Sequence, residues 1–313
     1  MELRNKGVFL FSEGLSASQL AQAVQRIERL GYGAVWFPEA VGREPFAKAA
    51  FILAHTERLV AATGIVNIYG RDAMVCAMGQ QTLNEQSGGR FLLGLGVSHS
   101  LLVGLRGHEY GKPVATMRRY LEQLRECHKL ISVEKNLLVE GMDKQPVGSG
   151  ERGAIVTPTG EMPVILAALG PKMTELAGAM AQGSHPANTT PEHTAKSREI
   201  LGPGPWLAPF QRVCLTNDAA RARAIGRQLI GFYLQLPNYR NVWLDSGFTT
   251  DDFEHGGSDR LVDAMLAWGD ENTIRRRVQE HLDAGADHVP VFSVDAEKPH
   301  LPCWRALEAI AAG

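Results

Sequence analysis

The chain has 313 residues, of which 44% are hydrophobic and 21% are charged, and its formal net charge is −2. This length suits one large α/β domain, and the near-neutral charge gives no attraction to nucleic acid or to an anionic membrane. The sequence has neither an apolar run of the roughly 18–20 residues that span a bilayer nor a signal-peptide core. We expect a reduced, metal-free, cytoplasmic protein, because its four cysteines have no Cys-x-x-Cys spacing and no histidine partners at metal-binding spacing.

Short apolar segments alternate with amphipathic ones along the chain, as buried strands alternate with helices. In chain order the predicted strands are 7–11, 34–37, 59–68, 91–95, 163–169, 183–186, 208–216 and 287–294. Helix starts are marked by a capping box at Ser16, by Thr190 before a proline and by Asp270. A helix, a glycine cap and a strand recur at 30–35 and 284–289, so we predict a single (β/α)8 barrel over residues 1–313.

The segment 59–99 is the clearest strand–helix–strand unit of the sequence. Its predicted helix, 71–86, ends at Gly88-Gly89, because glycine adopts the left-handed conformation of a C-terminal cap. Helical spacing predicts one apolar side formed by Met74, Val75, Met78, Thr82 and Leu83, with Gln80, Asn84 and Glu85 elsewhere. Later in the chain, two insertions are expected, at about 133–162 and at about 236–269. The first is rich in glycine, proline and charge, and residues 236–258 are irregular, aromatic and placed over the barrel mouth.

Two buried strands joined by a helix make a right-handed βαβ unit with parallel strands. Chemistry in such units lies just past the carboxyl ends of the strands. In the 59–99 unit those ends present Asn67, Tyr69, Ser98 and His99. We therefore predict the active site here.

Two other motifs give weaker signals at the same place. Gly94-Leu95-Gly96 follows a strand, but the third glycine of a dinucleotide fingerprint is missing. Ser98 is not surrounded by the G-x-S-x-G elbow of a hydrolase. Neither a Rossmann domain nor a serine hydrolase is favoured.

Five segments in this order carry a resemblance to a known family: GYGAVWFPE, TGIVNIY, SGGRFLLGLGVSH, ALGPKM and GSHPANTTPEHT, at 31–39, 63–69, 87–99, 168–173 and 183–194. They resemble the luciferase-like (β/α)8 oxidoreductases, and most closely the branch that uses the deazaflavin coenzyme F420. The resemblance runs from about Gly31 to Ala296, interrupted around 133–161. It implies a bacterial luciferase-like TIM barrel with insertions.

The resemblance also assigns a cofactor site. A glycine in a buried strand often marks a bulge or a close approach to a ligand, and in this family the position of Gly64-Ile65 carries a non-prolyl cis peptide behind the (deaza)flavin ring. Gly170 starts a helix whose free N–H groups, with Lys172, suit an anion, and the coenzyme's phosphate would bind there by resemblance. The expected cofactor-binding residues are Glu39, Gly64, Ile65, Asn67, Gly96, Val97, Ser98, Leu169, Gly170, Lys172, Met173 and His185.

The catalytic residues are expected to be His99 and Glu39, although the chain departs from the family here. Family members have an acidic residue at the position of Glu39, often followed by histidine, and this chain has Ala40 instead. His99 falls where the sugar-phosphate dehydrogenase branch places a catalytic glutamate. His99 then supplies acid–base chemistry alone, or it is a structural residue that holds the loop. His185 and His108 are weaker candidates, and His193 is expected to be solvent-facing or structural.

The leading hypothesis is an oxidoreductase that transfers hydride between F420 and a small organic substrate, such as an imine, an enone or an alcohol–carbonyl pair. The first alternative is an FMN-dependent two-component monooxygenase, and the second is a non-catalytic barrel subunit that stabilises a partner. We expect a small-molecule substrate, no nucleic-acid or membrane partner, and a homodimer.

Overall fold

The computed structural model describes residues 1, 3, 5–132 and 162–312. The expected insertion at 133–162 therefore lies almost wholly outside the described residues. The strands of the described part are β1 (Lys6–Phe9), β2 (Ala34–Phe37), β3 (Val60–Thr63), β4 (Val66–Asn67), β5 (Phe91–Gly96), β6 (Val164–Leu166), β7 (Gly183–Ser184), β8 (Trp206–Leu207), β9 (Gln211–Leu215), β10 (Leu266–Gly269) and β11 (Val289–Val294). The pairings between these strands are parallel.

The strands form one curled sheet in the order β10-β9-β11-β1-β2-β3-β5-β6-β7-β8, with β4 paired to β5. β8 and β9 are successive segments of one stretch of chain, 206–215, yet β8 pairs with β7 and β9 pairs with β11. Residues 206–215 therefore join the part of the sheet that contains β7 to the part that contains β11. The predicted parallel α/β sheet is confirmed, and each predicted strand has a counterpart.

The number of strands differs from the predicted eight for local reasons. The third predicted strand is broken into β3 and β4 at Gly64-Ile65, and the seventh into β8 and β9. β10 was not predicted, and it pairs with the free edge of β9. Residues 236–258 were predicted to be irregular, which is wrong: they form α10 (Pro237–Asp245) and the 3₁₀ helix η3 (Thr250–Gly256).

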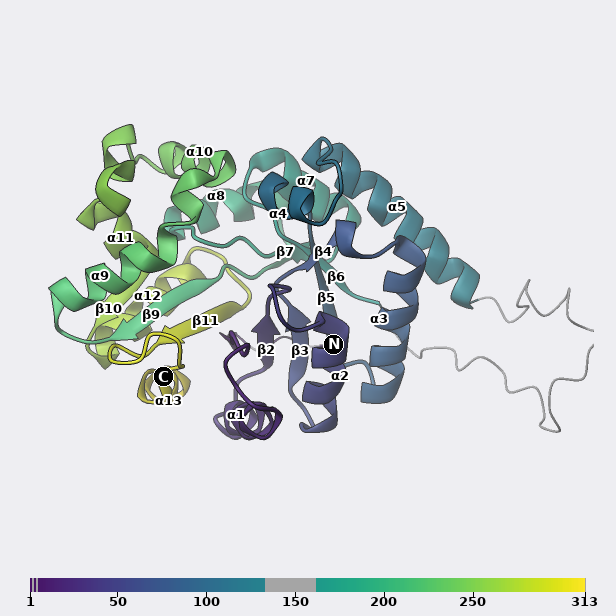
Figure 1. Cartoon of the computed structure of the whole chain (residues 1–313), viewed down its shortest axis with the longest axis horizontal. Helices are drawn as coiled ribbons and strands as arrows, with labels where there is room; N and C mark the ends of the chain where they lie inside the picture. Colours follow the sequence, from purple (N-terminus) through teal and green to yellow (C-terminus); the bar gives the residue numbers. More distant parts are fainter. Residues whose placement is uncertain (2, 4, 133–161, 313) are drawn as a thin grey trace, which may run out of the picture.

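Helices surround the sheet, and α4, α7 and α10 lie together along one end of it (Figure 1). The remaining helical elements are α1 (Ala17–Arg29), α2 (Pro45–Ala54), α3 (Ala73–Ser87), α4 (Ser100–Leu105), α5 (Pro113–Ser132), α7 (Pro171–Met180), α8 (Pro191–Leu201), α9 (Ala219–Ile230), α11 (Asp259–Met265), α12 (Glu271–Asp283), α13 (Trp304–Ala311), η1 (Ile68–Gly70) and η2 (Tyr233–Gln235). The predicted N-caps Ser16, Thr190 and Asp270 are confirmed, as is the left-handed Gly88 cap, with φ of 65°.

The buried face predicted for α3 is wrong except at Leu83, which is buried. Val75 and Met78 are 52% and 53% exposed, whereas Gln80 and Asn84 are buried. The two amides face inward because they bond to the backbone: Gln80 Nε2 donates to the Pro163 carbonyl oxygen at 2.9 Å, and Asn84 Oδ1 accepts from the Phe91 N–H at 3.1 Å. Side-chain hydrogen bonds to strand ends therefore override the apolar periodicity in this helix.

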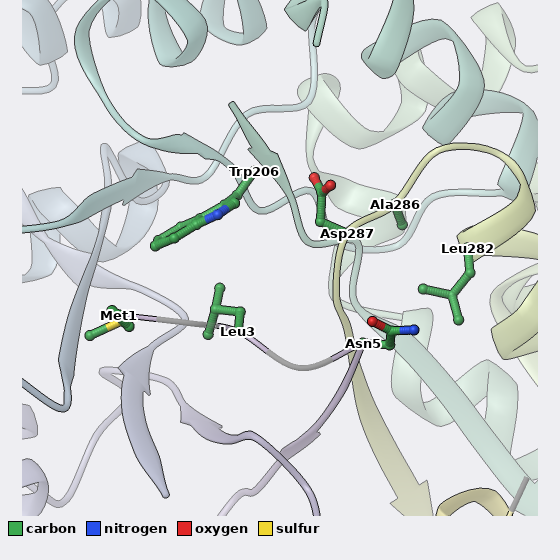
Figure 2. Close-up of a pocket in the computed structure, with 7 residues that line it drawn as sticks. All are labelled: Met1, Leu3, Asn5, Trp206, Leu282, Ala286 and Asp287. Carbon is green, nitrogen blue, oxygen red and sulfur yellow. The ribbon is translucent and has the colours of Figure 1, made fainter. Parts of the chain in front are cut away.

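A cavity of about 520 Å³ lies at the amino ends of the strands (Figure 2). Asn5 precedes β1, Trp206 begins β8, and Asp287 precedes β11, so this cavity is at the end of the sheet opposite the predicted active site. In (β/α)8 barrels the amino ends of the strands serve stability, and the chemistry lies at the carboxyl ends. In the described part of the chain, no helix is long and apolar enough to cross a membrane, and no group of side chains could hold a metal ion.

Candidate active site

The residues predicted to bind the cofactor gather where β2, β4, β5 and β6 end. The Glu39 N–H donates to the Ile65 carbonyl oxygen at 3.1 Å, and the Ala167 N–H donates to the Leu95 carbonyl oxygen at 2.9 Å. Adjacent carboxyl ends are thereby held in register. Besides Glu39, six of the predicted residues are half-exposed at this junction: Gly64, Ile65, Val97, Ser98, Leu169 and Gly170.

At the break between β3 and β4, Gly64 and Ile65 are half-exposed, whereas the residues of both strands are buried. The peptide bond Gly64-Ile65 is cis, as predicted. The Ile65 side chain packs where a Cβ on Gly96 would lie, with Cδ1 only 2.6 Å from that position. A side chain at Gly64 would meet Phe9 and His185 on the interior side.

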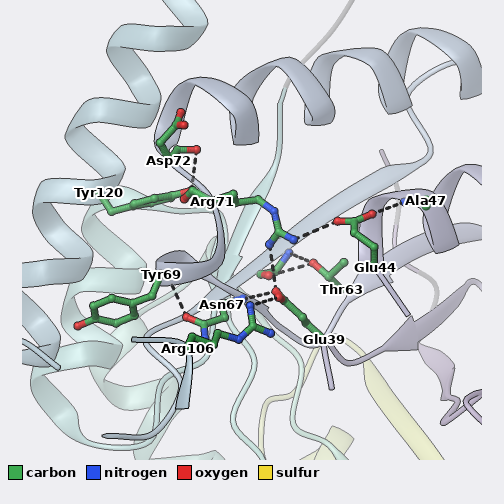
Figure 3. A network of polar contacts seen from close by, with 11 residues as sticks. Glu39, Glu44, Ala47, Thr63, Asn67, Tyr69, Arg71, Asp72, Arg106 and Tyr120 are labelled. Atoms are coloured by element: carbon green, nitrogen blue, oxygen red, sulfur yellow. Dashed lines mark hydrogen bonds and ion pairs between the residues drawn. The ribbon is translucent and has the colours of Figure 1, made fainter. Parts of the chain in front are cut away.

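The Glu39 carboxylate is held by three donors, as Figure 3 shows. Its Oε2 accepts from the Asn67 N–H at 2.8 Å and from Arg71 Nη1 at 3.0 Å, and its Oε1 pairs with Arg106 Nη1 at 2.9 Å. The side chain is only 5% exposed. This carboxylate, buried between two guanidinium groups, connects the end of β2 to Asn67, Arg71 and Arg106. Its catalytic role stays a prediction.

Removing the Glu39 charge should destabilise the protein. Glu39→Gln leaves the guanidinium of Arg71, which is 9% exposed, without its main buried partner, so we expect a loss of about 3 kcal/mol in unfolding free energy. The matched control is Glu44→Gln, which removes the other partner of Arg71. Glu44 is 52% exposed, and we expect a loss of about 1 kcal/mol or less. Urea unfolding measures both values, and equal losses would contradict the buried-pair interpretation.

His99 leaves β5 at the same end of the sheet. Ser98 adopts a left-handed backbone with φ of 57°, which turns the chain before α4. The His99 ring lies 5.9 Å from the ring centroids of both Phe232 and Tyr239, so the segment around η2 and α10 reaches over the predicted catalytic histidine. Burial lowers the pKa of His99 below its ordinary value of 6.5.

Of the other three histidines considered above, His185 and His193 have structural surroundings. His185 is buried in the sheet interior, where its Nδ1 contacts the Ala208 carbonyl oxygen at 2.7 Å and its ring stacks on Trp36 at 4.5 Å. Burial lowers its pKa to about 4. His193 is also buried, and its Nε2 lies 2.8 Å from the Leu169 carbonyl oxygen. Of the two alternatives for His193, the structural one is confirmed.

Lys172 lies exposed in the first turn of α7, the helix that follows β6 in the chain. No ion pair is recorded for it among the described residues. Gly170 has no side-chain cap and has open space where a Cβ would point. Within the helix, Met173 already donates its N–H to the Gly170 carbonyl oxygen at 3.1 Å. The anion-binding capacity of this turn therefore rests chiefly on Lys172 and its own N–H.

Sequence reasoning missed the residues that surround the predicted set. Arg71 follows η1 and Arg106 follows α4 in the sequence. Only folding brings their charges to Glu39. Tyr239 belongs to the segment 236–258, which was predicted to be irregular, and Phe232 lies just before that segment. The aromatic residues of the expected insertion at 236–258 were the one signal in the sequence that this part of the chain covers the site.

Comparisons with known proteins agree with this architecture. The family model for luciferase-like monooxygenases matches residues 6–288. A Mycobacterium tuberculosis protein that carries the name coenzyme F420-dependent oxidoreductase is 26% identical over 318 residues, covering 89% of this chain and 91% of that protein.

Two solved structures share the fold. An F420-dependent secondary alcohol dehydrogenase in complex with an F420-acetone adduct aligns with a TM-score of 0.72 and 15% identity, covering 99% of this chain and 98% of the other. The oxygenating constituent of 3,6-diketocamphane monooxygenase from Pseudomonas putida, in complex with FMN, aligns with a TM-score of 0.69 and 15% identity, covering 99% and 97%. Because the family model spans most of the residues, the chain belongs to the luciferase-like monooxygenase family.

Proposed function

We propose that the protein is an F420-dependent oxidoreductase that transfers hydride between the deazaflavin and a small organic substrate, such as an imine, an enone or an alcohol–carbonyl pair. The observation that carries the proposal is the half-exposed carboxyl end of the parallel sheet, where the Ile65 side chain packs against Gly96 and where His99 follows β5. The relative named for F420 chemistry supports the choice of cofactor.

The residues present fit this cofactor. A flat ring needs an uncovered, apolar support, and Ile65 and Val97 are half-exposed on neighbouring strands. A phosphate needs donors and positive charge, and Lys172 offers both at the start of α7. We assign the ring to the Gly64-Ile65 side, and the phosphate to Gly170 and Lys172. Glu39 acts by fixing the strand end that carries the ring support.

When bound, the deazaflavin supplies hydride from, or accepts it at, the central carbon of its ring. The chain's own residues have three tasks. The aromatic side chains Phe232 and Tyr239 limit water around His99. The His99 imidazole holds the proton that accompanies hydride transfer. Exclusion of water also strengthens the polar interactions that orient a substrate.

Lys172→Ala should weaken F420 affinity by about fivefold at low salt, which corresponds to about 1 kcal/mol. The loss should shrink as salt is added, because a screened charge contributes less. Fluorescence titration at several ionic strengths measures it. Lys129→Ala is the control, because Lys129 pairs with Glu126 on the surface of α5. Equal affinities for the parent and Lys172→Ala at every ionic strength would place the phosphate elsewhere.

An FMN-dependent monooxygenase is the second candidate function, because an FMN-bound monooxygenase shares the fold across nearly the whole chain. Anaerobic turnover separates the two. In the absence of oxygen, at least one member of a panel of imines, enones and ketones should oxidise the reduced deazaflavin. The visible absorption band of the oxidised deazaflavin should then appear. Turnover that requires FMN and oxygen would reject the proposal, and binding of neither cofactor would favour a non-catalytic barrel subunit. The expected homodimer and cytoplasmic location stay predictions.

A further inference from the structure

Arg212 is a buried cation in the middle of an otherwise uncharged strand. It lies on β9, where it is aligned with Phe292 of β11 and Leu266 of β10. Only 4% of the residue is exposed. Among the described residues, no aspartate or glutamate forms an ion pair with it. Buried arginines are ordinarily paired with a carboxylate, so this one lacks its usual counter-charge.

The polar groups around Arg212 leave donors without an acceptor. Arg212 Nη1 donates to Asn188 Oδ1. Within the described part of the chain, Arg212 Nε and Asn188 Nδ2 are buried and have no hydrogen-bond partner. Both atoms can only donate. A water molecule could accept from them, but it would leave the charge of the guanidinium without compensation.

Aromatic side chains form the walls of this site. The guanidinium carbon lies 4.8 Å from the ring centroid of Phe210 and 5.5 Å from that of Tyr233. Trp243 of α10 donates its indole N–H to the Asn188 carbonyl oxygen at 2.9 Å, which fixes the loop after β7. Burial lowers the pKa of the Arg212 guanidinium, against smaller opposite effects of Tyr233 and Tyr239. A guanidinium nevertheless keeps its proton in proteins, so the charge persists.

Ring contacts connect Arg212 to the predicted catalytic residues. Tyr233 lies 4.8 Å from Tyr239, and Tyr239 lies 5.9 Å from His99. On the other side, Phe210 lies 4.6 Å from Phe9, whose ring lies beside Gly64. Arg212 is thus two aromatic side chains away from both the proposed proton donor and the cofactor support.

We propose that Arg212 and Asn188 form a receptor for an anionic oxygen of the substrate, so that the substrate is an organic anion, such as a carboxylate. The part of this inference that makes the anion a substrate of hydride transfer rests on the proposed function. The binding of the anion to Arg212 and Asn188 does not. An anionic oxygen would accept from Arg212 Nε and Asn188 Nδ2 and would compensate the buried charge. The aromatic walls would pack against the apolar part of the same molecule.

Benzoate is the test ligand, with benzamide as its neutral counterpart of similar shape. Binding to the protein without cofactor is measured by saturation-transfer NMR and thermal shift at constant ionic strength. We expect benzoate to bind and benzamide to bind at least ~10-fold more weakly. Arg212→Met should reduce benzoate affinity by ~10- to 100-fold, because a charge-assisted hydrogen-bonding group is lost. Arg240→Met is the matched control, because Arg240 stacks on Phe253 of the same covering segment, and it should bind benzoate as the parent does.

The stability of Arg212→Met without ligand separates a receptor from a structural residue. Replacing an uncompensated buried charge with an apolar side chain should leave the melting temperature unchanged or raise it. A structural role in holding Asn188 would instead lower the melting temperature, and this result would overturn the proposal. If Arg212→Met does not fold, Arg212→Lys keeps the charge without the planar fork and should show weaker benzoate binding with unchanged benzamide binding.

F420 titration of the same variants identifies the source of the anion. Unchanged F420 affinity in Arg212→Met, together with lost benzoate binding, supports an anionic substrate. F420 affinity that falls with Arg212→Met would assign the receptor to the cofactor and would overturn the substrate class. Failure of the parent to bind benzoate would also overturn it. A parent that binds benzoate but selects FMN over F420 would reject the proposed function alone.

Discussion

Replacing His99 with asparagine should lower the single-turnover rate of hydride transfer by about 10²–10⁴-fold while leaving F420 affinity near the parental value. Asparagine keeps hydrogen-bonding capacity but cannot exchange a proton near neutral pH, and this range is the usual contribution of a positioned acid or base. Stopped-flow absorbance of the bound cofactor measures the rate. His55→Asn is the control, because His55 caps α2 and its Nδ1 contacts the Phe51 carbonyl oxygen at 2.7 Å.

The pKa of His99 also predicts the direction in which the rate changes with pH. Burial lowers the pKa of His99 below 6.5, so its acidic form is lost as pH rises through a value below 6.5. Substrate reduction, which needs a donated proton, should therefore slow as pH rises through that range. Substrate oxidation, which needs the neutral imidazole, should accelerate over the same range. His99→Asn should flatten both profiles. A parental rate and profile in this variant would remove His99 from the mechanism.

Gly64→Ala should destabilise the protein by about 1–3 kcal/mol, the usual cost of overpacking a core, and should weaken F420 binding. An added Cβ would lie 2.7 Å from Phe9 Cε2 and 2.9 Å from His185 Nε2. Neither ring can move easily: Phe9 and His185 are 5% and 3% exposed, and the His185 ring is fixed by its contact with the Ala208 carbonyl oxygen at 2.7 Å. Gly64→Val should cost more than Gly64→Ala.

A second substitution tests whether this contact is the cause. Phe9→Leu in the Gly64→Ala background removes part of the ring that the new Cβ would meet, so it should recover stability relative to the sum of the single changes. Gly14→Ala is the control, because a Cβ on Gly14 would have no atom within 4 Å. Unfolding free energies from urea titration decide the point. A Gly64→Ala protein as stable as the Gly14→Ala protein would contradict the packing argument.

The parts of the fold that depend on local signals could be predicted from the sequence. Ser16, Thr190 and Asp270 cap their helices in the structure because a capping side chain bonds to an N–H only three residues away. The break at Gly64-Ile65 was predicted from a glycine in an apolar strand together with the family resemblance. The helix η3 begins with a comparable signal, the capping box of Thr249 and Asp252, which went unrecognised, and β10 was not predicted.

The parts that depend on distant partners could not be predicted. Most of the predicted apolar side of α3 faces outward because Gln80 and Asn84 find backbone partners at Pro163 and Phe91, which periodicity alone does not reveal. Likewise, the ion pairs of Glu39 could not be predicted, because its two arginine partners lie 32 and 67 positions further along the chain. Arg212 did leave a signal, a charge within the strand QRVCL, but its missing counter-charge appears only in the folded chain.

The most direct test of the central claim is a titration of the purified protein with oxidised F420 and, in parallel, with FMN at the same ionic strength. The proposed function predicts saturable F420 binding with a change in its absorption spectrum, weaker binding of FMN, and a lower F420 affinity for Lys172→Ala. Tighter binding of FMN than of F420, or no binding of either cofactor, would contradict it.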